Sequence, residues 1–234
     1  MAGSLALVGA GEFLPAMAEV DRGLLEATGM DRPRVVILPT ASWPDGEKVF
    51  LRWAAMGAEH FRALGAEVEP LYVRTTVDGM DAANLQAVGE ADLIYLSGGK
   101  PRHLLTVLAG SPLGDAVRSA HRRGAVVVGC SAGAMVLADR QPDMPRRFPF
   151  PIRWRVALGL VSEAAVLPHY DHWPEPLVAL VALQAPRGGV VLGIDEDAVA
   201  LGRNGAWQVQ GTGRVTLWRG RRRERYRKGE AFRI

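Results

Sequence analysis

The sequence of 234 residues contains one cysteine, Cys130, and no long apolar run. A lone cysteine excludes an internal disulfide, and no Cys/His cluster has the spacing of a zinc site. Crossing a bilayer takes about 18 or more consecutive apolar residues. We therefore expect no disulfide, no metal, no cofactor and no membrane association, and we expect a reducing, cytoplasmic location.

An excess of charge of one sign is also missing, because 28 basic residues face 25 acidic ones and leave a net charge of +3. The arginine excess gathers at residues 219–228, where a nucleic-acid or membrane patch is one interpretation. Gly220 and Gly229 break that region, and Val215 and Tyr226 punctuate it with apolar or aromatic side chains. This pattern favours a surface hairpin, so we expect no nucleic-acid partner.

What is present is an ordinary globular composition, with 48% hydrophobic and 23% charged residues. Such a chain fits one domain, residues 1–234. Over the first two thirds, short apolar runs alternate with stretches of helical periodicity, which predicts an α/β fold with a doubly wound, mostly parallel sheet flanked by helices. The expected strands are residues 5–8, 35–39, 68–73, 93–97 and 125–129. The expected helices are residues 16–28, 47–64, 82–88, 101–109 and 112–124, several of them closed by glycine.

The last third has a different pattern. Residues 141–154 hold four prolines, three arginines and two phenylalanines without a clean period, which predicts a loop over the sheet edge. From Val190 onward, short apolar runs are separated by Asn204-Gly205 and by Gly211-Thr212-Gly213. These turn signals predict C-terminal antiparallel hairpins.

Four loops leave predicted strands at their carboxyl ends: residues 9–12, 39–42, 97–100 and 129–133. In doubly wound sheets, ligands bind beyond the carboxyl ends of the strands. These loops should therefore line the cleft.

The last of these loops holds a G-x-S-x-G motif, Gly129-Cys130-Ser131-Ala132-Gly133, after an apolar strand and before an apolar helical run. A chance match in a tight turn is the alternative, but the strand-before, helix-after context predicts a nucleophile elbow with Ser131 at its tip. The start of the helix would direct the Ala132 N–H to a developing oxyanion. Gly99, in the Ser97-Gly98-Gly99 turn, would supply a second N–H.

A serine nucleophile needs a base, and histidine titrates in the right range. Of the five histidines, His60 and His121 are expected on solvated helix faces, and His103 nearer the cleft. His169 directly follows the apolar run of residues 164–167, so we prefer it as the base. His172, in the same loop, is the rival.

A third group, usually a carboxylate, orients the histidine. Asp195-Glu196-Asp197 directly follows a buried-looking strand, and a solvated turn is the other interpretation of these acids. In the Ser, acid, His order of α/β-hydrolases, the acid would instead come from between the serine and the histidine. The candidates for that order are Asp139, Asp143 and Glu163.

Several motifs, taken in order, resemble the dipeptidase E and cyanophycinase family of serine peptidases, whose fold is similar to class I glutamine amidotransferases. They are the 8–12 and 38–42 segments, Ser97-Gly98-Gly99, the 129–134 segment, Leu167-Pro168-His169 and the 193–196 segment. The resemblance spans nearly the whole chain. It implies Ser131 as nucleophile, His169 as general base and then acid, and Glu196 as the partner of the histidine. It also implies an oxyanion hole of the Gly99 and Ala132 N–H groups.

The resemblance also implies a substrate. Known members cleave peptides at acidic residues, so a small peptide or an acidic amino-acid-derived substrate is expected, with Gly98 and Lys100 beside it. Many members carry an amide side chain where this chain has Lys100. Arginines of the 141–154 loop could pair with a substrate carboxylate, or could simply form a solvated loop face. These are Arg146, Arg147 and Arg153.

Two alternatives and one open question remain. Cys130 could be the nucleophile, but its place before the apex of the elbow should turn its side chain away from the cleft. A non-catalytic small-molecule-binding protein could keep the same fold. The oligomeric state is open, with a homodimer as one candidate.

Overall fold

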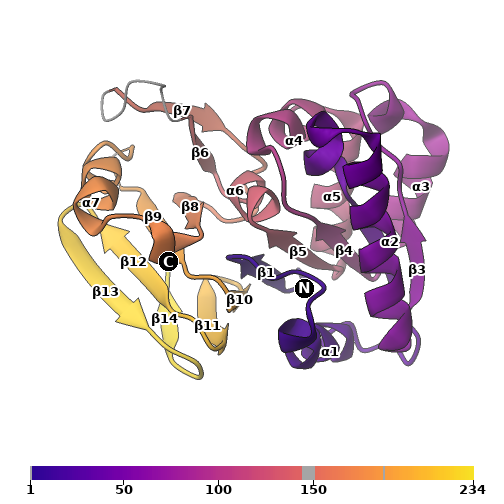
Figure 1. Ribbon diagram of the computed structural model, residues 1–234, viewed down its shortest axis with the longest axis horizontal. Helices are drawn as coiled ribbons and strands as arrows, with labels where there is room; N and C mark the ends of the chain where they lie inside the picture. Colours follow the sequence, from indigo (N-terminus) through magenta and orange to yellow (C-terminus); the bar gives the residue numbers. More distant parts are fainter. Residues whose placement is uncertain (1, 144–150, 187) are drawn as a thin grey trace.

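The computed structural model describes residues 2–143, 151–186 and 188–234. Within these residues, the centre is an eight-stranded sheet in the order β14-β11-β10-β1-β5-β4-β2-β3 (Figure 1). The strands from β1 to β3 in this order run parallel, whereas β10 pairs with β1 antiparallel. The prediction of a mostly parallel sheet is confirmed. The bounds are β1 Leu5–Val8, β2 Arg34–Leu38, β3 Glu67–Pro70, β4 Leu93–Leu96, β5 Val126–Cys130, β10 Ala198–Arg203, β11 Ala206–Gly211 and β14 Ala231–Arg233.

Helices cover both faces of this sheet because successive strand side chains point to opposite faces. Val35 and Ile37 of β2 pack with α1 and α2, whereas Val36 and Leu38 pack with the cluster that includes α3, α4, α5 and α6. The doubly wound arrangement follows from this alternation (Figure 1). The helix bounds are α1 Ala18–Glu26, α2 Glu47–Ala63, α3 Ala82–Glu90, α4 Pro101–Leu108, α5 Pro112–Arg123 and α6 Ala132–Leu137.

The predicted helix boundaries follow real capping signals. The Ser111 side chain accepts a hydrogen bond from the Gly114 N–H at 3.1 Å and so begins α5. Gly124, at φ 122°, ends it. α1 begins two residues later than expected because residues 15–17 form a separate 3-10 helix. β3 ends at Pro70, a residue tolerated on this edge strand, so the expected extension to residue 73 is wrong, although the Leu71 N–H still donates to the Ile37 carbonyl oxygen of β2.

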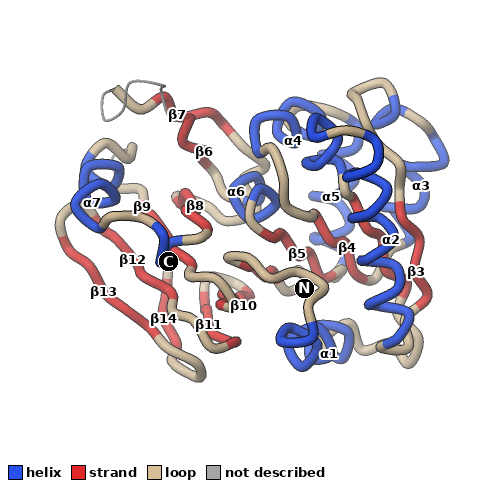
Figure 2. Tube along the Cα trace, in the orientation of Figure 1, coloured by secondary structure: helices blue, strands red, loops and turns tan. Residues whose placement is uncertain are grey.

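A second sheet has the order β13-β12-β9-β8 (Figure 2). β8 and β9 are parallel, with α7 between them in the sequence, and α7 packs through Val178 and Val181 against one face of the sheet. The antiparallel hairpins β10–β11 and β12–β13 are confirmed, and the second one contains the arginine-rich 219–228 region. The sequence pattern predicted neither α7 nor the parallel pairing of β9 with β8. The bounds are β8 Ala164–Pro168, β9 Val190–Ile194, β12 Val215–Arg219, β13 Arg222–Tyr226 and α7 Glu175–Leu183.

The segment expected to be a loop, residues 141–154, instead begins and ends in strands. β6 Arg140–Asp143 pairs antiparallel with β7 Arg153–Val156, and an ion pair of 2.7 Å joins Asp143 to Arg155. Backbone pairing therefore orders residues 140–143 and 153–156, although the sequence has no clean period there. Residues 144–150, with Arg146 and Arg147, lie outside the described residues. No helix in the described part of the chain is long and apolar enough to cross a membrane.

Strand register brings the functional loops to one edge. Val8 lies opposite Cys130 and Leu96 opposite Gly129, so the loops after β1, β4 and β5 leave the sheet side by side. In the second sheet, Pro168 lies opposite Ile194, so the loops after β8 and β9 also emerge together. The two groups of loops meet, because a Cβ on Gly9 would lie only 2.0 Å from the Asp195 carbonyl oxygen.

Candidate active site

Ser131 occupies the sharp turn between β5 and α6, with φ 49° and ψ −106°. Its N–H donates to the carbonyl oxygen of Val8 at 2.9 Å, which fixes the turn against β1. A serine at positive φ stores backbone strain, and such strain collects at functional sites. Strand, strained turn and helix follow one another as the G-x-S-x-G motif predicts.

The glycines of the motif are needed because the backbone approaches itself closely. A Cβ on Gly129 would lie 2.5 Å from the carbonyl carbon of Gly133. A Cβ on Gly133 would lie 2.2 Å from the carbonyl oxygen of Leu96 in β4. No side chain fits at either position without moving the backbone.

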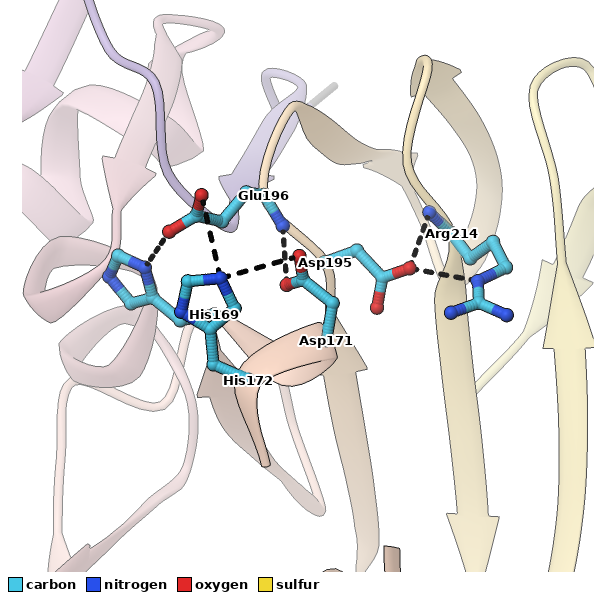
Figure 3. Close-up of polar contacts among 6 residues, drawn as sticks. All are labelled: His169, Asp171, His172, Asp195, Glu196 and Arg214. Atoms are coloured by element: carbon cyan, nitrogen blue, oxygen red, sulfur yellow. Dashed lines mark hydrogen bonds and ion pairs between the residues drawn. The ribbon is translucent and has the colours of Figure 1, made fainter. Parts of the chain in front are cut away.

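The structure brings the three expected polar residues into one hydrogen-bonded chain. The Ser131 Oγ lies 3.0 Å from the His169 Nε2. The His169 Nδ1 lies 2.8 Å from the Glu196 Oε1, as Figure 3 shows. His169 directly follows β8 and has a left-handed backbone, φ 50° and ψ 40°, which turns its ring out of the strand direction toward Ser131. Hydroxyl, imidazole and carboxylate in this order can activate the hydroxyl as a nucleophile.

Neighbouring side chains hold the loop that carries Glu196. The Asp171 Oδ1 accepts a hydrogen bond from the Glu196 N–H at 3.0 Å. Asp195, only 4% exposed, accepts from the backbone N–H of Arg214 at 3.2 Å and from its Nε at 2.9 Å (Figure 3). The roles of Asp171 and Arg214 were not predicted from the sequence, because each contact joins residues that are distant along the chain.

His172, the rival base, lies on the outer side of Glu196. Its Nε2 is 3.9 Å from the Glu196 Oε2 and 3.9 Å from the Asp171 Oδ2, and its side chain is 66% exposed. The ligand atoms of these three residues lie within 4.8 Å of one another, so they could hold a cation at the rim of the site. A serine, histidine and carboxylate chain needs no metal to activate the serine.

Two of the other histidines are more enclosed than expected. His60 is largely buried and pairs with buried Asp21 at 2.8 Å. His121 donates from Nε2 to the Gly3 carbonyl oxygen at 3.0 Å, and burial lowers its pKa. The expectation of solvated helix positions was wrong for both, because tertiary contacts of their helices cover them. His103 contacts the Arg74 carbonyl oxygen at 2.8 Å.

The two proposed oxyanion donors lie in turns that leave their N–H groups available. Gly99 has φ 140°, and a Cβ on Gly98 beside it would lie 3.3 Å from the Ser131 Cβ. Among the described residues, no acceptor is found for the N–H of Gly99 or of Ala132. The first N–H groups of a helix have no partner within the helix, so Ala132 is suited to bind an anion.

Cys130 is fully buried among side chains of the α1 and α2 face. Its S–H donates to the Glu12 Oε2 at 2.9 Å. Burial, and then the charge of Glu12, raise the pKa of the Cys130 thiol well above its ordinary value. As its place before the elbow predicts, its side chain is turned away from the Ser131 hydroxyl, and a raised thiol pKa opposes a nucleophilic role.

Lys100 begins α4 at the rim of the site, and its side chain is 58% exposed. Its Nζ pairs with the Asp45 Oδ1 at 2.9 Å. Asp45 ends the 3-10 helix Thr40–Asp45, whose Ala41 carbonyl accepts the Lys100 N–H at 2.7 Å. The loops after β2 and β4 are thus joined on the side of the Gly98-Gly99 turn.

The acids required by the Ser, acid, His order lie elsewhere. Asp139 contacts Arg140 at 3.3 Å, and Asp143 contacts Arg155. Glu163 occupies the turn before β8, at φ 54°. The carboxylate that reaches His169 comes after the histidine in the sequence, in the loop after β9.

Comparisons with known proteins identify the family of the chain. The chain matches the model of Peptidase family S51 over residues 5–208. It is 27% identical over 194 residues to a cyanophycinase of Geminocystis herdmanii (strain PCC 6308), with 78% of this chain and 68% of the relative covered. It is 29% identical over 214 residues to a cyanophycinase of Trichormus variabilis (strain ATCC 29413 / PCC 7937), with 85% and 67% covered.

A solved structure extends the similarity to the whole chain. The crystal structure of a peptidase from an acI-B1 Actinobacterium superimposes with a TM-score of 0.88 and 30% sequence identity, covering 100% of this chain and 98% of that one. Motif order, fold and relatives therefore agree. The chain belongs to peptidase family S51, the family of dipeptidase E and cyanophycinase, and is a serine-type peptidase.

Proposed function

We propose that Ser131, His169 and Glu196 are a catalytic triad that hydrolyses a peptide or isopeptide bond at an acidic residue. One observation carries the proposal: the unbroken contact chain of 3.0 Å from Oγ to Nε2 and 2.8 Å from Nδ1 to Oε1. Each contact lies within the hydrogen-bond reach that proton transfer requires.

The reaction begins with proton transfer. With Nδ1–H donated to Glu196, the His169 Nε2 is the basic nitrogen and accepts the Ser131 proton while Oγ attacks the substrate carbonyl. The Glu196 carboxylate stabilises the resulting imidazolium. His169 then gives the proton to the leaving amine, and an acyl-enzyme forms on Ser131. Water, deprotonated by His169, releases the acyl group and restores the hydroxyl.

The tetrahedral intermediate carries a negative oxygen that needs donors already in place. The N–H groups of Gly99 and Ala132 serve this role, since each lies in a turn beside Ser131 and has no acceptor among the described residues. A preorganised oxyanion donor contributes about 10²- to 10³-fold to the rate.

Acidic specificity is supported by Lys100 and by the cyanophycinase relatives. The Asp45 carboxylate forms an ion pair with the Lys100 ammonium, and a substrate carboxylate would replace Asp45 in that pair. Lys100→Met should raise KM for an aspartyl substrate roughly 10-fold, because one charge-assisted contact is lost. Asp45→Asn should lower KM by removing the competing carboxylate. Unchanged KM in both variants would remove Lys100 from the substrate site.

The experiment that tests the function uses three substrate classes: aspartyl dipeptides, isoaspartyl dipeptides and cyanophycin. Their hydrolysis is measured with the wild type and with Ser131→Ala. Cleavage of any one by the wild type, abolished in Ser131→Ala with an unchanged melting temperature, supports the proposal and selects the substrate. Absence of cleavage by the wild type would favour another acyl substrate or a binding role. Cleavage retained in Ser131→Ala would contradict the assignment.

A further inference from the structure

The loop of residues 9–12 contains no triad residue, yet it contacts the Gly98-Gly99 turn, the Cys130-Ser131 elbow and the turn that carries Glu196. The Val8 carbonyl just before it accepts the Ser131 N–H. A Cβ on Gly9 would collide with the Asp195 carbonyl oxygen, and one on Gly11 would lie 2.6 Å from the Asp197 Oδ1. The loop therefore packs between the Cys130-Ser131 elbow and the turn of residues 195–197.

Glu12 ends this loop and places its carboxylate inside the protein, where it is 6% exposed. Its Oε1 accepts the Gly98 N–H at 2.9 Å. Its Oε2 accepts the Cys130 S–H at 2.9 Å. One carboxylate thus bridges two segments, 86 and 118 residues away in the sequence, that flank the Ser131 side chain.

The Glu12 carboxylate destabilises charged forms of the acidic groups buried around it. Buried Asp21 lies near enough that the charge of Glu12 adds to the burial that raises the pKa of Asp21, and His60 partly offsets the increase. Burial raises the pKa of the Tyr95 hydroxyl, and the nearby charges of Asp21 and Glu12 raise it further. A buried acid that destabilises its neighbours needs a compensating role.

The backbone after Glu12 is also strained. Phe13 has φ 63°, a conformation that a bulky residue rarely adopts, and its ring packs at 4.8 Å from the Tyr95 ring centroid. The strained residue and its aromatic anchor hold the Glu12 side chain pointing inward. Strain of this kind persists where the surrounding structure fixes it, and it collects at functional sites.

We propose that Glu12 is a positioning residue that ties the Gly98-Gly99 turn to the Cys130-Ser131 elbow and so fixes the oxyanion donors relative to the nucleophile. The proposal rests on the proposed function of Ser131. Glu12 holds the Ser97-Gly98 peptide, and the Lys100 N–H bond to the Ala41 carbonyl oxygen holds the peptide after Gly99, so the Gly99 N–H lies between two fixed peptides.

This role predicts a particular kinetic change. A displaced oxyanion donor affects the transition state and leaves substrate binding almost unchanged, so kcat should fall while KM stays the same. A misplacement of about 1 Å can cost about 10²-fold in rate. Removal of the Glu12 carboxylate should therefore lower kcat roughly 10- to 100-fold.

Three variants separate positioning from general stability. Glu12→Ala removes both contacts. Glu12→Gln keeps an oxygen for the Gly98 N–H and should restore kcat to within about 5-fold of wild type. Asp21→Asn is the matched control, because Asp21 is a buried acid of the same cluster that contacts His60 rather than the elbow. It should change the melting temperature and leave kcat unchanged.

The test measures kcat, KM, the rate of Ser131 modification by a fluorophosphonate, and amide exchange in residues 96–100. We expect Glu12→Ala to lower kcat and the modification rate together, with KM within about 3-fold of wild type and faster exchange at residues 96–100. A Glu12→Ala enzyme with wild-type kcat and exchange overturns the proposal. So does a loss in Asp21→Asn equal to that in Glu12→Ala.

Failure of the proposed function gives a different result. In that case the wild type neither cleaves the substrates nor reacts with the fluorophosphonate, and the catalytic role of Glu12 is lost with it. If the wild type reacts and Glu12→Ala reacts equally fast, only the positioning role is wrong.

Discussion

The two sheets contribute to the site in different ways. The eight-stranded sheet presents Ser131 through steric constraint, with Gly129 and Gly133 packed against neighbouring backbone. The four-stranded sheet presents His169 and Glu196 on loops held by polar contacts, because Asp171 accepts the Glu196 N–H and Arg214 binds the neighbouring Asp195. The nucleophile is thus held by close backbone packing, whereas the groups proposed to activate it depend on a network of side chains.

The largest effect should come from the contact that joins His169 to its acid. Glu196→Gln should lower kcat about 10³- to 10⁴-fold with little change in KM, because the wrong imidazole tautomer is favoured and the imidazolium is not stabilised. Asp171→Asn, which changes only the neighbouring loop contact, should cost far less. Steady-state kinetics of the two variants provide the check. Similar losses in both would mean that Glu196 acts only through loop order.

Steric constraint in the central sheet should appear as a loss of stability. Gly133→Ala should cost about 3 kcal/mol or more in the free energy of unfolding, since its Cβ would meet the Leu96 backbone. Gly23→Ala in α1 is the control: no atom lies within 4 Å of its Cβ, so a gain of about 0.5–1 kcal/mol is expected. Urea denaturation measures both. Equal stability of the two variants would show that close backbone packing does not constrain the elbow.

Removal of a polar contact in the second sheet should lower the free energy of unfolding less than Gly133→Ala does. Arg214→Ala removes the side-chain partner of buried Asp195 and should cost about 1–3 kcal/mol, together with a decrease in kcat from a looser Glu196 loop. Arg222→Ala breaks an exposed pair with Glu224 in the same sheet and should be nearly neutral. Melting temperature and kcat of both variants test this. Unchanged values in Arg214→Ala would show that the turn holds without it.

The smallest effect concerns pH, at a position remote from the second sheet. Burial lowers the folded-state pKa of His121 below its ordinary value of 6.5. As pH falls below 6.5, the unfolded chain binds a proton that the folded chain does not bind, so stability decreases. The melting temperature of His121→Gln should therefore fall less than that of the wild type between pH 7.5 and about 5. Parallel decreases in both proteins would contradict this contribution.

Local signals in the sequence were sufficient to predict the elbow and the carboxyl edge of the eight-stranded sheet. Gly129 packs against Gly133 and the Ser111 side chain caps Gly114, so the effects of both can be predicted from spacing, whereas the contact of Gly133 with Leu96 of β4 is visible only in the structure. The strand pattern likewise gave the carboxyl edge. These features depend on backbone sterics and side-chain alternation over a few residues.

The second region depends on contacts that no local pattern reveals. The parallel pairing of β8 with β9 joins Ala164 to Val190, and α7 between them is apolar on most faces, so its period is weak. Resemblance selected Glu196 from three adjacent acids, whereas residue chemistry alone left a solvated turn open. Glu12 was missed as a site residue because its role comes from two segments about 100 residues away.

The most direct test of a serine on one sheet activated by a histidine on the other is covalent modification of Ser131. Wild type and His169→Ala would be treated with a fluorophosphonate, and the modified peptide identified by mass spectrometry. We predict a single adduct at Ser131 in the wild type and at least a 10²-fold slower reaction in His169→Ala. An adduct at another residue, or equal rates in the two proteins, would contradict the account.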